Sequence, residues 1–492
     1  MLSDLLQNSL KTAGDTSLQR RLYRIIRAAI LQGQLGPGQK IPSSRALASE
    51  LLLSRVTILG AYENLLAEGY LVSRRGSGTF VADTPLLPQP VSTKFQATAP
   101  SPGITKAISV APMLSLRGSK AIVGTRGITA YEGAFVPGVA DVRHFPFHQW
   151  LRVQNRYWRK QHLQLTGYGD NGGYRPLRQA LAEYLQVSRS VRCRPEQIII
   201  TAGTHQSIDL CARMLTDPGD AAIVEDPCHW AGPVVLQAAG LDVMSIQVDD
   251  EGLCLPPHPL PSAVRLAFVT PSHQYPSGVS MSLPRRNLLL ERAHAQNFWI
   301  MEDDYDSEFR YDTQPLPSLQ GSDAFGRVIY LGTFSKVMYP GLRLSYMVVP
   351  EDLAESFSVG LTQLFRPGSL VTQAAMAEFI TQGYFATHIR RMRNVYAERQ
   401  AELRRALACN FGDQITLSNG KAGLHLTSYF RRGIDLGKMA KLAEKEGVML
   451  RALSHYQQGT SDKQGFLLGY GGVATDAVGG AVKKMLAAYE QC

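Results

Sequence analysis

From about residue 131 onward, the sequence alternates short apolar runs with longer stretches of helical periodicity. The apolar runs are rich in β-branched and aromatic residues, and they cover residues 198–201, 221–224, 266–269, 299–301 and 328–331. Continuous apolar strands belong in a sheet that is covered on both faces, and the helical stretches between them favour parallel pairing. The region is therefore predicted to be an α/β domain built on a mainly parallel sheet.

Ligands bind at the carboxyl ends of the strands in such a sheet, so the residues after each run are candidates for a site. The first run is followed by Gly203, Thr204 and His205, a small-residue turn that opens a helix. Backbone amides at a helix N-terminus together with a hydroxyl can seat a phosphate, although such a turn on its own is usually a simple cap. His229 and Tyr275 follow two further runs, and His229 can place a planar ring over a cofactor.

The run at 299–301 leads into four carboxylates around one tyrosine, Tyr305. Burying such a cluster is costly unless the carboxylates meet cations. A protonated pyridine nitrogen is a suitable cation, and an aspartate beside it keeps the ring an electron sink, which makes Asp303 a candidate. An exposed acidic loop and a metal site are the alternatives, although no His/Asp spacing favours a metal.

After the run at 328–331, Lys336 lies in a small, polar turn, and Arg343 follows seven residues later. A desolvated lysine amine can form a Schiff base with an aldehyde, while the planar fork of arginine suits a phosphate. Pyridoxal phosphate carries both groups. A lone lysine in a loop is usually a plain surface residue, but the neighbours of Lys336 favour the cofactor interpretation.

The N-terminal segment has a different pattern, in which apolar residues from 18 to 30 recur at helical spacing. An N-cap serine precedes a second helical stretch near residue 44, and a third runs from about residue 54 to 68. A hairpin with a glycine-rich tip follows, in which Arg74 and Arg75 precede Gly78. This order predicts a winged helix whose third helix enters the DNA major groove, where Arg55 and Thr57 reach bases or phosphates.

The charge of the chain supports an acidic polymer as partner for this segment. The formal net charge is +10, and nine of these positive charges lie within residues 1–128. The rest of the chain is almost neutral, with 36 Lys/Arg against 35 Asp/Glu. A basic N-terminal segment joined to a nearly neutral remainder is typical of DNA-binding proteins, although a basic segment can also only increase solubility.

The N-terminal motifs resemble the GntR-type winged-helix domain of bacterial repressors and activators. The matching stretches are Pro42-Ser43-x-Arg45-x-Leu47-Ala48, Ser54-Arg55-x-Thr57, Glu68-Gly69 and Gly76-Ser77-Gly78-Thr79-Phe80-Val81. The resemblance implies that Arg45, Arg55, Thr57 and Gly78 contact a double-stranded DNA operator.

The C-terminal motifs, taken in order, resemble fold-type I aminotransferases. They are Tyr168-Gly169-x-x-Gly172, Gly203-Thr204, Asp226-Pro227, Pro276-Ser277-Gly278, Asp303-x-Tyr305, Ser335-Lys336 and Arg343. The resemblance implies that Lys336 forms the internal aldimine, Asp303 pairs with the pyridine nitrogen and Tyr305 bonds the ring hydroxyl. The phosphate would be held by Gly203, Thr204, Thr333 and Arg343. Tyr168 would reach the site of a partner subunit, which implies a homodimer.

The fusion of both parts resembles the MocR/GabR-type regulators, but the substrate side departs from aminotransferases. Tyr275 replaces the usual asparagine before the Pro-Ser-Gly turn, and Leu467 stands where an arginine normally clamps a substrate carboxylate. Arg451 is a candidate substitute. Loss of that clamp removes much of the orientation that turnover needs, so a sensor is expected rather than a catalyst.

The resemblance implies that such a regulator senses a small amine or amino acid, or pyridoxal phosphate itself. The first rival is a working aminotransferase with a DNA-binding head, and the second keeps the fold without the cofactor. The expected organisation is a winged helix over 15–82, a proline-rich linker over 83–128, and an aminotransferase-like effector and dimerisation domain over 129–492 with a small C-terminal α/β subdomain. The basic residues of the linker either help to hold DNA or only keep the linker solvated.

The remaining features favour a cytoplasmic protein. The six cysteines form no Cys-x-x-Cys pair and have no regular spacing, which indicates neither a zinc site nor a disulfide framework. No apolar run approaches the roughly 20 residues of a membrane span, and the N-terminus lacks the basic start of a signal peptide.

Overall fold

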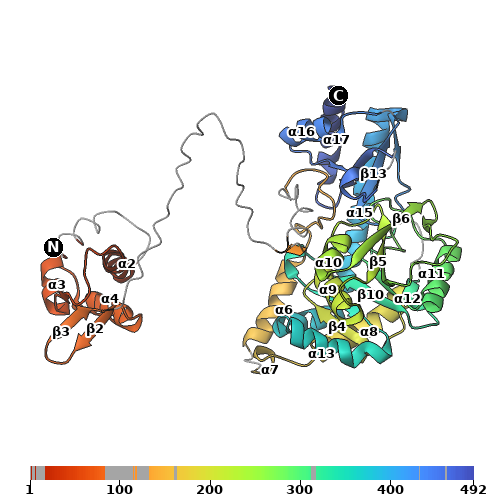
Figure 1. The fold of residues 1–492 in the computed structure, drawn as a ribbon. Helices are drawn as coiled ribbons and strands as arrows, with labels where there is room; N and C mark the ends of the chain where they lie inside the picture. Colours follow the sequence, from red (N-terminus) through yellow and green to blue (C-terminus); the bar gives the residue numbers. More distant parts are fainter. Residues whose placement is uncertain are drawn as a thin grey trace, which may run out of the picture. The chain divides into compact units, whose positions relative to one another are not determined.

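The computed structural model describes residues 17–83, 132–159, 163–311, 317–431, 433–459 and 463–492, together with the single residues 2, 6, 115, 117 and 118. The chain divides into two compact units, residues 1–109 and 110–492 (Figure 1). Nearly all of the predicted linker, residues 83–128, lies outside the described residues.

The N-terminal unit is a winged helix, as predicted. Its helices are α2 (Leu18–Leu31), α3 (Ser44–Leu51) and α4 (Arg55–Ala67), and its strands are β1 (Lys40–Ile41), β2 (Leu71–Arg74) and β3 (Gly78–Val81), in the sheet order β1-β3-β2. Serine side chains cap two helices: Ser43 accepts a hydrogen bond from the amide of Ala46, and Ser54 accepts one from the amide of Thr57. The cap at Ser54 fixes where the third helix begins.

The C-terminal unit is built on an eight-stranded sheet in the order β4-β11-β10-β9-β8-β5-β6-β7. Strands β10, β9, β8, β5 and β6 pair in parallel, whereas β11 and β7 are antiparallel to their neighbours. The strands are β4 (Ile198–Thr201), β5 (Ala221–Asp226), β6 (Asp242–Asp249), β7 (Gly252–Leu253), β8 (Val264–Val269), β9 (Trp299–Asp304), β10 (Val328–Thr333) and β11 (Ser345–Val348). The five predicted runs are all strands of this mainly parallel sheet.

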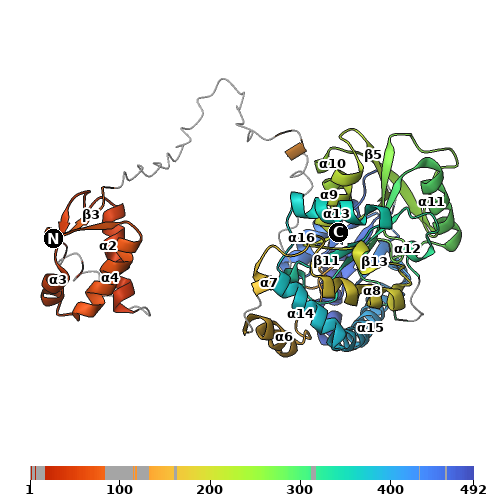
Figure 2. The same cartoon turned by 90° about the horizontal axis from the view of Figure 1, so that it is seen from below.

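Both faces of the central strands are buried, which explains why these strands are apolar without alternation, whereas β6 near the edge is partly exposed. In β10, Ile329 and Leu331 pack into one apolar cluster, while Tyr330 packs into another on the opposite face. Helices surround the sheet (Figure 2). They are α6 (Phe147–Arg159), α7 (Leu163–Thr166), α8 (Arg175–Arg189), α9 (Thr204–Leu215), α10 (Ala231–Ala239), α11 (Leu283–Gln296), α12 (Leu319–Ser322), α13 (Ala354–Leu364) and α14 (Leu370–Thr381).

The predicted small C-terminal subdomain forms one end of this unit, where β13, α16 and α17 lie together (Figure 1). Its four-stranded sheet has the order β12-β13-β15-β14, with β12 (Ile415–Leu417), β13 (His425–Phe430), β14 (Arg451–Ala452) and β15 (Gly465–Gly469). Its helices are α15 (Tyr384–Phe411), α16 (Leu436–Lys445) and α17 (Thr475–Tyr489). None of the helices in the described parts of the chain is long and apolar enough to cross a membrane.

Candidate functional site

A cavity of about 480 Å³ lies at the carboxyl ends of the parallel strands. It collects residues that follow β4, β5, β8, β9 and β10, together with residues of the small subdomain. Ten of the eleven residues predicted to hold the cofactor line it: Gly203, Thr204, His205, His229, Tyr275, Asp303, Tyr305, Thr333, Lys336 and Arg343. The fold therefore brings strand-end residues that are far apart in sequence into one site.

Lys336 projects into this cavity from the turn after β10. Its Nζ atom donates a hydrogen bond to the backbone oxygen of Gly138 at 2.7 Å. Burial lowers the pKa of the Lys336 amine, while the nearby carboxylates of Asp306 and Asp303 act in the opposite direction. A desolvated amine of this kind is a better nucleophile toward an aldehyde than a surface lysine is.

Asp303 is a buried carboxylate that faces the same cavity. Among the described residues, its Oδ1 atom has no hydrogen-bond partner. Burial raises the pKa of Asp303 to about 7, the charge of Asp304 adds to this rise, and Lys336 opposes it. A buried, unpartnered carboxylate oxygen is costly unless a cation meets it, and the pyridinium nitrogen of pyridoxal phosphate fits that requirement.

An anion seat lies at the start of α9. Gly203 has a φ of +145°, and a Cβ atom there would lie 3.0 Å from a terminal nitrogen of the Arg343 guanidinium. The positive φ favours glycine at this position, where the Arg343 guanidinium lies close to the start of α9 and lines the same cavity as Thr204. The Thr333 hydroxyl accepts hydrogen bonds from the Ser335 amide at 3.2 Å and from the Ser345 hydroxyl at 2.8 Å. Together these groups suit a phosphate.

Aromatic side chains form a wall of the cavity. The His229 ring stacks on Trp230 at a centroid distance of 5.5 Å and meets Tyr275 edge-on at 5.1 Å. Burial lowers the pKa of His229 to about 3, and the charges of Lys336 and His205 add to the effect. The ring is thus neutral, which suits stacking on an aromatic ligand.

The four carboxylates of the 302–306 segment are all buried, so the exposed-loop alternative is wrong. Glu302 accepts backbone hydrogen bonds from Leu319 and Gln320 at 2.8 and 2.9 Å. Asp304 forms an ion pair with Arg189 at 2.6 Å. Because Asp306 accepts from His273, only Asp303 is left facing the cavity without a partner in the described structure.

The comparisons with known proteins match both units. Residues 138–463 match the model of aminotransferase class I and II, and residues 18–81 match that of the gntR family of bacterial regulatory proteins. Over 464 residues, the chain is 40% identical to the probable rhizopine catabolism regulatory protein MocR of Rhizobium meliloti, which covers 93% of this chain and 91% of MocR. The chain belongs to the MocR-type family of transcriptional regulators.

Other relatives and solved structures agree with this assignment. The pyridoxine biosynthesis transcriptional regulator PdxR of Corynebacterium glutamicum is 32% identical over 96% of this chain and 95% of PdxR. The kynurenine aminotransferase structure of Pyrococcus horikoshii has a TM-score of 0.66 at 25% identity. The match covers 74% of this chain and 92% of the aminotransferase chain. A Thermococcus profundus aminotransferase has a TM-score of 0.68 at 23% identity, over 77% and 97% of the two chains, and supports the fold alone.

Several cavity residues of this MocR-type chain were not predicted from the sequence. Gly138, His425 and Tyr456 line the cavity, but they lie outside the strand-end motifs and no local pattern marks them. Asp306 also lines it, and its place in the acidic segment was a usable signal. Arg451, which was only a candidate substitute for the missing carboxylate clamp, lines the cavity as well.

The departures from aminotransferases are visible in the packing. Leu467 is fully buried in β15 and packs with Tyr275 and Tyr456, so no cation stands at that position. The Tyr275 hydroxyl donates to that of Tyr456 at 3.4 Å. Tyr168, the eleventh predicted residue, lies outside the cavity: it is 80% exposed, and the Arg366 guanidinium lies 5.4 Å from its ring.

The predicted DNA-contacting residues of the GntR-type unit lie at its surface. Arg45, Arg55, Arg75 and Gly78 are exposed. Arg74 is also exposed, and its guanidinium lies 4.9 Å from the ring of Phe80. Thr57 differs, because its hydroxyl is 2.7 Å from that of Ser54 and takes part in capping α4.

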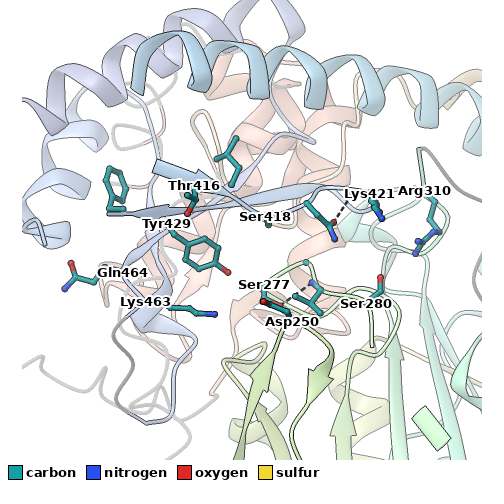
Figure 3. Close-up of a pocket in the computed structure, with 15 residues that line it drawn as sticks. Asp250, Ser277, Ser280, Arg310, Thr416, Ser418, Lys421, Tyr429, Lys463 and Gln464 are labelled. Atoms are coloured by element: carbon teal, nitrogen blue, oxygen red, sulfur yellow. Dashed lines mark hydrogen bonds between the residues drawn. The ribbon is translucent and has the colours of Figure 1, made fainter. Parts of the chain in front are cut away.

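A second cavity, of about 870 Å³, lies where loops of the large sheet domain meet the small subdomain (Figure 3). Polar side chains from both parts surround it, including Asp250, Ser277, Arg310, Lys421 and Lys463. None of the predicted cofactor residues lines this second cavity.

Proposed function

We propose that this MocR-type regulator binds pyridoxal phosphate on Lys336 and uses it to sense a small amine or amino acid, or the cofactor itself. The proposal rests on one cavity that contains three matching groups. They are the desolvated amine of Lys336, the unpartnered buried carboxylate of Asp303 and the guanidinium of Arg343 at the start of α9. When bound, pyridoxal phosphate supplies an aldehyde that condenses with amines. The chain's own groups hold its phosphate, its ring nitrogen and its ring face.

Among these signals, the cavity wall favours an amine that carries a carboxylate. Arg451 lies on the same cavity as Lys336, and an arginine fork is the group that best pairs with a carboxylate. The relatives support either kind of signal, since MocR is a probable regulator of rhizopine catabolism and PdxR is a regulator of pyridoxine biosynthesis.

The GntR-type unit binds double-stranded DNA in the bacterial cytoplasm, and the chain acts as a homodimer. Exposed arginines around the start of α4 and on the β2–β3 hairpin support DNA binding.

The exposed Tyr168 supports a homodimer, because an aromatic side chain at the surface can reach the site of a partner subunit. An effector that binds one conformation more tightly than another then changes the DNA affinity.

Absorbance of the purified full-length protein tests the cofactor assignment. Added pyridoxal phosphate should give a visible band that dialysis does not remove in the wild type and that is absent in Lys336→Ala. The matched control is Lys438→Ala, an exposed lysine on α16, which should keep the band. A wild-type protein without the band would favour the rival in which the fold has lost its cofactor.

Turnover separates a sensor from an aminotransferase. Incubation with amino donors and keto acids should give a spectral change without sustained product formation, because Leu467 offers no carboxylate clamp. Steady turnover would favour the working enzyme.

Arg451→Leu should weaken the spectral response to amino acids much more than the response to amines without a carboxylate.

A further inference from the structure

His273 and Asp306 form a buried pair behind the phenol of Tyr305. Their exposed fractions are 4% and 1%. The Nδ1 atom of His273 lies 3.1 and 3.2 Å from the two carboxylate oxygens of Asp306 and 3.0 Å from the Tyr305 hydroxyl. The same hydroxyl lies 3.0 Å from the backbone oxygen of His273. One imidazole nitrogen therefore joins a carboxylate to the tyrosine that faces the cavity.

The fold holds this pair tightly from both domains. His273 lies on the loop after β8, and Asp306 follows β9, so both come from the large sheet domain. Gly423 of the small subdomain closes over them with a φ of +86°, and a Cβ atom there would overlap both the His273 ring and the Asp306 carboxylate. The His425 ring stacks on His273 at 4.9 Å with 28° between the planes. Little room remains for the imidazole to rotate.

The cluster of His273, Asp306 and His425 also has the composition of a metal site, with ligand atoms within 4.8 Å of one another. A metal bound through Nδ1 of His273 would need the lone pair of that nitrogen. That nitrogen already lies at hydrogen-bond distance from a carboxylate and a hydroxyl. Two acceptors at this distance indicate that the nitrogen carries a hydrogen and donates it. A hydrogen-bond chain therefore accounts for the geometry better than an ion does.

The placement of the hydrogen atoms follows from the acceptors. An ionised Asp306 accepts only, so the hydrogen between it and His273 belongs to Nδ1. The Tyr305 oxygen can then accept from the same N–H, which leaves its own hydrogen to donate. With the cavity empty, that hydrogen has the backbone oxygen of His273 as acceptor. A ligand oxygen in the cavity is the alternative acceptor.

We propose that His273 and Asp306 are positioning residues that keep the Tyr305 hydroxyl a strong donor toward the ring oxygen of bound pyridoxal phosphate. This inference rests on the proposed cofactor site. A stronger donor neutralises more of the negative charge on that oxygen, and the nitrogen bonded to the cofactor then holds its proton less tightly. The pair thereby sets the pH at which the bound cofactor changes protonation.

Other charged and titratable groups face the same region and stay in place when His273 alone is changed. Tyr305 is surrounded by Asp306, Tyr275, Asp303 and Glu225. Lys336 is influenced by Asp306 and Asp303, and it acts in turn on His229 and His425. A change at Asp306 would remove a charge close to Lys336 directly, so the informative substitutions are at His273.

The test is a pH titration of the visible band in two matched variants. Asn places an amide N–H near the position of Nδ1, whereas Gln places one near Nε2, away from Tyr305. We expect His273→Asn to keep the wild-type midpoint within a few tenths of a unit and His273→Gln to raise it by about one pH unit. Equal midpoints in the two variants would overturn the proposal.

A double-mutant cycle makes the test independent of general structural effects. In a Tyr305→Phe background, His273→Gln should move the midpoint no further, because the hydroxyl through which it acts is gone. The same shift in both backgrounds would also overturn the proposal. Failure of the underlying cofactor assignment gives a different result, since the wild type would then show no visible band at all.

Discussion

At the scale of single residues, the site depends on the contrast between buried carboxylates that have partners and one that has none. Asp304 is paired with Arg189, whereas Asp303 faces the cavity with an unpartnered oxygen in the described structure. A residue of this kind destabilises the empty protein and favours the filled one, which is typical of binding sites.

The affinity for pyridoxal phosphate should depend on pH through Asp303. With a pKa of about 7 in the empty cavity, this carboxyl group is protonated at pH 6 and charged at pH 8. Binding of a protonated ring nitrogen needs the charged form, so the affinity should rise about tenfold between these values. Equilibrium titrations should show the rise in the wild type, and a similar rise in Asp303→Asn would contradict this role.

The same residue should limit the stability of the empty protein. The pKa of Asp303 is raised above its ordinary value, so its contribution to stability is lost as the pH increases from about 4 to about 7. Asp303→Asn should therefore stabilise the cofactor-free protein at pH 8 by up to about 4 kcal/mol and much less at pH 4. Thermal unfolding at both pH values measures this, and a destabilised variant at pH 8 would count against it.

The sequence predicted those cavity residues that lie at or just after strand ends, such as Thr204, Asp303 and Lys336. Each lies within a local motif whose position at a strand end can be deduced. His425 and Tyr456 come from the small subdomain, and their approach to the cavity depends on long-range packing that no local pattern encodes. The pairing of His273 with Asp306 has the same origin.

At the scale of elements, β10 shows how the sheet positions the site. Gly332 lies directly opposite Tyr346 of β11, and a Cβ atom at Gly332 would overlap the Tyr346 ring. The next residue is Thr333, which lines the cavity. Close contact between these two strands therefore fixes the start of the turn that carries Lys336.

Gly332→Ala should destabilise the C-terminal unit by at least about 2 kcal/mol, because buried strands cannot move apart to admit a methyl group. Gly480→Ala is the control, since Gly480 is exposed in α17 and a Cβ atom there meets nothing within 4 Å. That change should be neutral or should stabilise by about 0.5–1 kcal/mol. Chemical denaturation measures both, and equal effects would refute the packing argument.

The sequence predicted the five strands with apolar runs, but neither their order nor the antiparallel strands β7 and β11. Residues 345–348 are as buried as the other central strands, yet β11 inserts between β4 and β10 in the opposite direction. Strand order depends on contacts between distant segments. Helix starts were easier, because the serines at 43 and 54 cap locally.

At the scale of the whole molecule, a substitution that impairs one unit should leave the binding function of the other unit intact. Arg55 is exposed at the start of α4 and belongs to the N-terminal unit. Arg55→Ala should weaken DNA binding about tenfold or more and reduce its salt dependence, while the visible cofactor band stays unchanged. Normal DNA affinity in this variant would show that α4 is not the recognition helix.

The central claim is that the cofactor site controls DNA binding, and one comparison tests it directly. The DNA affinity of the full-length protein should be measured on a fragment that the protein itself selects from a random library, with pyridoxal phosphate and an amine panel present or absent. We expect at least one ligand to change the wild-type Kd by about 5- to 100-fold and to leave the Kd of Lys336→Ala unchanged. The same Kd for the wild type under every condition, or the same ligand response in Lys336→Ala, would contradict the account.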